Sequence, residues 1–175
     1  GLENFVNLFT DDPVFFSALG VSLKWVFFQV LLQLVFGTML ALVLNQKFRG
    51  RGIARTLVFM PWAISGIITG VMWGLIYNEH IGVLNDVLRR LGLIQNNIAW
   101  LGNERTVFGA VVVAELWRGI PFFAIMLLAG LQAIPDDLYE AAGMDGAGVF
   151  KKFFHVTLPF LKDTIILSTL LRAVW

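Results

Sequence analysis

Residues 139–159 read YEAAGMDGAGVFKKFFHVTLP, a polar and charge-bearing stretch that lies between two apolar ones. Just before it, Pro135 and two aspartates are typical of a helix start, because acidic side chains interact favourably with the N-terminal end of the helix dipole. Three glycines then interrupt the helical pattern, which favours a turn near Gly146. A second short helix is predicted after this turn, and Pro159 is expected to begin a third. The stretch therefore predicts helix, turn and helix at a membrane surface.

The composition is that of a membrane protein. Of the 175 residues, 58% are hydrophobic and 14% are charged, whereas about 25% are charged in a typical soluble domain. Sixteen phenylalanines and six tryptophans suit lipid contact and anchoring at the membrane interface. The absence of cysteine excludes disulfides and thiolate metal sites. With a net charge of +1, the chain gives no indication of nucleic-acid binding, so we expect membrane lipid as a partner and no nucleic acid.

The long apolar segments predict an all-α, polytopic transmembrane bundle that forms one domain over residues 1–175. Each of the first three segments can cross the roughly 30 Å hydrocarbon core as a helix. The last is too short to cross, so we expect the chain to be an internal fragment of a longer one. The predicted spans are residues 25–44, 54–77, 106–131 and 164–175 (truncated), and a loop over residues 132–163 precedes the last one.

The basic residues predict which side of the membrane each loop occupies. Residues 45–55 carry four basic side chains and no acidic one, which indicates the cytoplasmic side. Counting spans places the loop over residues 132–163 on the same side. On the opposite side, the loop over residues 78–105 contains an apolar stripe that predicts a short amphipathic helix ending at Gly92.

Two features of the second span have structural consequences. Pro61 lacks a backbone donor and is expected to kink the helix. Gly66, Gly70 and Gly74 recur at every fourth residue, a pattern that favours close packing against another helix.

The opening stretch resembles the EAA loop of the inner-membrane permease subunits of ABC importers. The family pattern is Glu-Ala-Ala, three residues, Gly, nine residues and Ile-x-Leu-Pro, and here Val156 replaces the isoleucine. The flanking residues 117–123 and 129–135 are similar to the carbohydrate-uptake, maltose-type branch. The matching positions are Glu140, Ala141, Ala142, Gly146, Leu158 and Pro159, and Asp145 and Ala147 fit the fuller form of the motif.

The resemblance implies a multi-pass permease subunit of the inner (plasma) membrane that forms half of the translocation pathway for a sugar or sugar-like solute. It implies four kinds of partner: membrane lipid, a second permease subunit, two ATP-binding subunits and an extracytoplasmic solute-binding protein. The chain has no Walker A motif, so we expect no enzymatic activity and no cofactor here, with ATP and Mg²⁺ on the partner ATPase.

The resemblance also implies that the EAA loop is cytoplasmic and couples the chain to that ATPase. In this interpretation Glu140 pairs with a basic residue of the partner, the two alanines permit close approach, and Gly146 sets the angle between the helices. Pro159 gives the next span a rigid start. An ordinary amphipathic connector is the alternative interpretation.

Polar residues within the predicted spans are candidates for the translocation path. Glu115 and Arg118 fall near the middle of the third span, where charge is costly, and either a structural pair or a place in the path explains them. Trp117 beside them can stack on a sugar ring or pack against lipid. Gln29 and Gln33 share one helix face, and hydrogen bonding between helices is the preferred account of both.

Two other functions are compatible with parts of the sequence. An ABC permease for an amino acid or a phosphate ester is one, because Arg118 and Arg172 leave an anionic substrate open. A secondary transporter or channel is less favoured, since such proteins need an ion-coupling site and often contain an inverted repeat, and no repeat is evident here.

Overall fold

The computed structural model describes residues 2–174, and these residues contain helices and no strands. The predicted all-α class is therefore confirmed. Gly1 and Trp175, the two ends of the predicted domain, lie outside the described residues. The elements are α1 (Glu3–Thr10), α2 (Phe15–Asn45), α3 (Arg51–Ala63), α4 (Gly66–Ile76), α5 (Val83–Arg90), α6 (Glu104–Gln132), α7 (Asp136–Met144), α8 (Val149–Lys152), the π-helix η1 (Phe153–Thr157) and α9 (Leu158–Val174).

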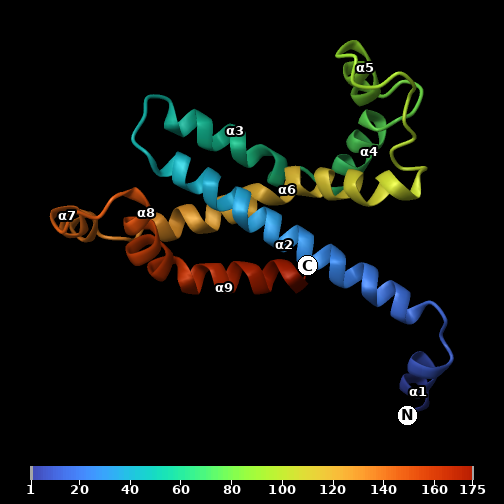
Figure 1. Cartoon of the computed structure of the whole chain (residues 1–175), viewed down its shortest axis with the longest axis horizontal. Coiled ribbons are helices and arrows are strands. Elements are labelled where there is room, and N and C mark those ends of the chain that lie inside the picture. The colour runs from blue at the N-terminus through green and yellow to red at the C-terminus, as the bar shows by residue number, and fades with distance from the viewer. Residues whose placement is uncertain (1, 175) are drawn as a thin grey trace.

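Helices α2 and α6 form the centre of the bundle and cross one another, with α9 lying along both (Figure 1). The crossing is close because Gly37 has no side chain: a Cβ added there would lie 2.5 Å from the Cβ of Phe123 and 3.2 Å from the backbone nitrogen of Ala124. Gly130 similarly admits α9, since its added Cβ would lie 2.7 Å from Leu161. The core is therefore built where small residues let three helices approach.

The described helices fit a polytopic membrane protein. Three helical runs are long and apolar enough to cross a membrane: residues 15–45, 104–132 and 149–174. Helices α3 and α4 would make a fourth span if the pair is counted as one. Much of the surface of these helices is apolar and exposed, as lipid contact requires.

The second predicted span is not one helix. Its two halves, α3 and α4, meet at an angle of 93°. Pro61, where a kink was predicted, lies inside α3, and the chain instead breaks at Ile64 and Ser65, whose backbones are extended. The prediction of the bend position was therefore wrong. Gly70 and Gly74 also lack the expected neighbour, because a Cβ added at either would meet nothing within 4 Å among the described residues.

The loop between α4 and α6 folds around a buried asparagine. The side chain of Asn85, on α5, donates to the backbone oxygens of Glu79 and Ile98 at 3.3 and 3.0 Å. Its oxygen accepts from the Ile98 backbone and from the Trp100 indole at 3.2 and 2.9 Å. The predicted short helix is confirmed as α5, and the chain leaves it through Gly92, which has a positive φ of 71°.

Candidate functional site

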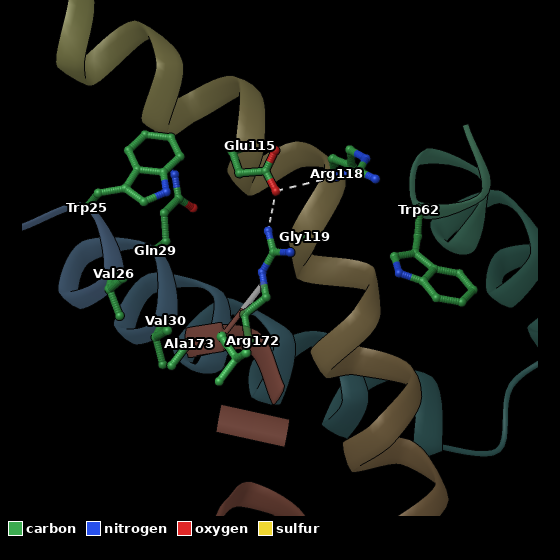
Figure 2. Close-up of a pocket in the computed structure, with 11 residues that line it drawn as sticks. Trp25, Val26, Gln29, Val30, Trp62, Glu115, Arg118, Gly119, Arg172 and Ala173 are labelled. Atoms are coloured by element: carbon green, nitrogen blue, oxygen red, sulfur yellow. Dashed lines mark hydrogen bonds and ion pairs between the residues drawn. The ribbon is translucent and has the colours of Figure 1, made fainter. Parts of the chain in front are cut away.

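A cavity of about 700 Å³ opens between helices α2, α3, α6 and α9. Figure 2 shows that the indoles of Trp25 and Trp62 lie on either side of a cluster of charged side chains. Aromatic faces next to convergent polar groups are typical of a site for a polar organic solute. The lining residues are Trp25, Val26, Gln29, Val30, Trp62, Glu115, Arg118, Gly119, Arg172, Ala173 and Val174.

The charged cluster joins three helices. Arg172 of α9 donates through Nη2 to the carboxylate of Glu115 on α6, and through Nε to the side-chain oxygen of Gln33 on α2 at 2.8 Å. Arg118 lies one turn after Glu115, and its Nη1 is 3.7 Å from the same carboxylate (Figure 2). One carboxylate thus faces two guanidinium groups, and the cluster holds α9 against α2 and α6.

The two glutamines of α2 serve mainly to join helices. Gln33 donates to the side-chain oxygen of Gln29 at 2.8 Å and approaches the backbone oxygen of Glu115 at 3.5 Å. Gln29 donates to the backbone oxygen of Val112 at 3.4 Å, and it also lines the cavity. Gly119 of α6 leaves room for this arrangement, because a Cβ added there would lie 2.3 Å from the amide nitrogen of Gln33.

The tryptophans of the cavity are not the one chosen from the sequence. Trp117 packs edge-on against Trp73, with ring centroids 6.0 Å apart, and does not line the cavity. Trp25 and Trp62 line it instead, together with Arg172. Two sequence signals could have identified these cavity residues. Trp25 lies one helical turn before Gln29, and Arg172 is a single cation in an apolar run.

The loop predicted to couple the chain to a partner is a projecting helix, turn and helix (Figure 1). Helix α7 starts after Pro135 with two aspartates in its first turn, and the chain turns at Gly146 with a φ of 73°. The predicted helix, turn and helix is therefore confirmed. Of the eight motif residues, six are exposed and two are half-buried: Glu140, Asp145, Gly146, Ala141, Leu158 and Pro159 are exposed, and Ala142 and Ala147 are half-buried.

Pro159 was predicted to begin a new helix, and this prediction was wrong. Pro159 is the second residue of α9, which continues α8 and η1 in one helical run over residues 149–174. The π turn explains how the run passes the proline: the backbone nitrogen of Leu158 bonds to the oxygen of Phe153, five residues back, so the carbonyls ahead of the ring are displaced. This turn is also fixed to α7, because the hydroxyls of Tyr139 and Thr157 are 2.9 Å apart.

Comparison with known proteins identifies the family. The family model described as "Binding-protein-dependent transport system inner membrane component" matches residues 33–175. The chain belongs to this family. Members of this family are transport components rather than enzymes. Transport in this family depends on a binding protein, so the interpretation as a secondary transporter is not favoured. Among residues 2–174, no three His, Cys, Asp or Glu side chains gather as a metal site would need.

Individual relatives in the binding-protein-dependent transport family carry names that refer to sugars. The trehalose/maltose transport system permease protein MalF of Thermococcus litoralis is 41% identical over 99% of the chain and 58% of its own length. The sulfoquinovosyl glycerol transport system permease protein SmoG of Agrobacterium fabrum is 36% identical over 99% of the chain and 56% of its own length.

A solved structure agrees with these relatives. A bacterial ABC transporter involved in the import of the acidic polysaccharide alginate is similar at a TM-score of 0.86 and 26% identity, covering 98% of the chain and 60% of the matched chain. The chain therefore spans somewhat more than half the length of the relatives it matches.

Proposed function

We propose that the full-length protein is a permease subunit of an ATP-driven importer and forms half of the translocation pathway for a sugar or sugar-like solute. The observation that carries this proposal is the cavity between α2, α3, α6 and α9, which combines two indole faces with amide, carboxylate and guanidinium groups. The sugar-related names of the relatives support a carbohydrate and do not favour an amino acid or a phosphate ester.

Membership of the family supports the proposed partners. A second permease subunit would complete the pathway, two ATP-binding subunits would supply energy, and an extracytoplasmic solute-binding protein would deliver the solute. One solved relative is an alginate transporter in complex with a periplasmic protein that holds an alginate pentasaccharide, which supports a binding protein. The proposed spans are residues 25–44, 54–77, 106–131 and 164–175.

The proposed ATPase contact is the exposed loop of α7, the turn at Gly146 and α8. Its place on the cytoplasmic side is supported by the basic residues in the loop over residues 45–55. The carboxylate of Glu140 is free to meet a basic residue of a partner, and the adjoining alanine is small enough to permit close approach. Closure of the ATP-binding subunits would displace this loop and switch the bundle between two states.

Replacing Gly146 by isoleucine in the full-length protein tests the contact. A β-branched residue is strained at a φ of 73°, so the angle between α7 and α8 should change. We expect G146I to weaken co-purification with the ATPase or to uncouple ATP hydrolysis from uptake. The matched control is Gly50→Ile, because Gly50 is also exposed, also has a positive φ (88°), has no atom within 4 Å of an added Cβ and lies outside the proposed contact. Equal behaviour of the two variants would contradict the proposed contact.

A further inference from the structure

The cavity carries more positive than negative charge. Its lining includes Arg118 and Arg172 but a single acidic residue, Glu115. All three side chains are mostly covered: their exposed fractions are 33%, 13% and 25%. Among the described residues, this lining therefore contains one more basic than acidic side chain.

The two arginines are not equivalent. Arg172 is engaged on both sides, with Nε bonded to Gln33 and Nη2 bonded to the carboxylate of Glu115. Arg118 approaches the same carboxylate only to 3.7 Å, which is too long for a hydrogen bond, and its buried Nε has no hydrogen-bond partner. Glu115 is therefore neutralised chiefly by Arg172, and Arg118 retains donors that are not used.

An uncompensated guanidinium in a membrane-embedded cavity is costly unless an anion enters. The planar fork of arginine donors matches the geometry of a carboxylate or another flat-faced oxyanion, and such charge-assisted hydrogen bonds are among the strong ones. The neighbouring indoles of Trp25 and Trp62 offer apolar faces of the kind that cover a sugar ring. The lining thus combines one anion site with surfaces for an uncharged ring.

We propose that the cavity accepts a saccharide that carries a single carboxylate or sulfonate group, and that Arg118 binds this group. The inference rests on the proposed function and specifies its substrate class. In this arrangement Arg172 and Glu115 position the helices around the cavity, and Arg118 selects the charge of the solute. A neutral sugar would leave the Arg118 donors without partners, so it would bind more weakly.

The test compares two probes that differ only at C6, which is a carboxylate in methyl β-D-glucuronide and a hydroxymethyl group in methyl β-D-glucoside. The full-length protein, purified with the subunits that accompany it, is placed in nanodiscs, and binding of each probe is measured by calorimetry at constant ionic strength. We expect the glucuronide to bind about tenfold more tightly or better, as a charge-assisted hydrogen bond would provide. In R118Q the preference should fall to about twofold or less, and R118K should retain part of it because the charge remains.

The matched control is Arg105→Gln, which removes an exposed arginine from the first turn of the same helix and should leave the preference unchanged. Equal affinity of the wild type for the two probes, or no binding of either, would overturn the proposal, and so would a preference that survives in R118Q. These outcomes leave the proposed function intact if an ATPase still co-purifies. Absence of any co-purifying ATPase would instead refute the proposed function.

Discussion

The close contact between α2 and α6 in the core gives a quantitative prediction at Gly37. Replacing it by alanine would place a Cβ 2.5 Å from the Cβ of Phe123, whereas carbon atoms pack at about 3.5 Å or more. The helices would have to separate by roughly 1 Å at this point. Two backbone atoms, the nitrogen of Ala124 and the oxygen of Ile120, stand at 3.2 and 3.3 Å, so a change of side-chain rotamer cannot relieve the contact.

The expected loss of stability follows from two opposing effects. Forcing an extra methyl group into a close-packed core costs about 1–3 kcal/mol, and Phe123 and Ala124 are fully buried. Alanine recovers up to about 1 kcal/mol because it favours helix more than glycine does. We therefore expect G37A to lower the unfolding free energy of the full-length protein by about 1–2 kcal/mol, measured by titrating detergent-solubilised protein with SDS and following circular dichroism.

Gly20 supplies the control within the same helix. A Cβ added there meets nothing within 4 Å, so G20A should leave stability unchanged or slightly raised. If G37A unfolds at the same SDS fraction as G20A, the close approach of α2 and α6 does not limit stability, and the reasoning from this contact fails.

Three further predictions concern polar groups outside the cavity. Tyr139→Phe keeps the ring but removes its hydrogen bond to Thr157, so the ATPase should still assemble while less solute is transported per ATP in a reconstituted transport assay. T157S keeps a hydroxyl and should behave as wild type in the same assay. Asn85→Ala removes four hydrogen bonds, so hydrogen exchange measured by mass spectrometry should be faster across residues 78–103. Unchanged protection would contradict the proposal that Asn85 holds this loop together. A hydrogen bond from Arg90 lowers the pKa of Asp86 below its ordinary value of 3.8. The stabilisation of α5 by this pair is therefore complete at neutral pH and is lost as the pH falls through the lowered pKa. In R90Q, NMR titration should show that the pKa of Asp86 has risen toward 3.8.

Sequence patterns predicted the helices better than they predicted which residues face the cavity. The turn at Gly146 was predictable because only a residue that tolerates positive φ fits there. The break at Ile64 and Ser65 was missed because Pro61, the stronger helix breaker, was chosen over the weaker Ser65-Gly66 turn signal, and yet Pro61 lies within α3. The direction of the chain at this point is therefore not determined by local propensity.

The composition of the cavity was harder to predict for a related reason. In a membrane bundle both the lipid-facing and the protein-facing surfaces are apolar, so periodicity does not show that Trp25 faces inward while Trp117 packs on Trp73. The bond between Arg172 and Glu115 joins residues 57 positions apart in sequence. A single sequence can indicate that each charge needs a partner, but it cannot show which distant residue provides it.

The unbroken helical run over residues 149–174 has a mechanical consequence. From Thr157, which is bonded to α7, to Arg172 in the cavity is fifteen residues, or about 22 Å of helix. If the run pivots as a rigid rod, a tilt of about 10° at the loop end would sweep Arg172 through roughly 4 Å. A displacement of that size is as large as the N–O separation of about 4 Å at which an ion pair is lost, so a small rotation at the loop would suffice to part Arg172 from Glu115. Movement of the loop would then be transmitted to the cavity through one rigid helix.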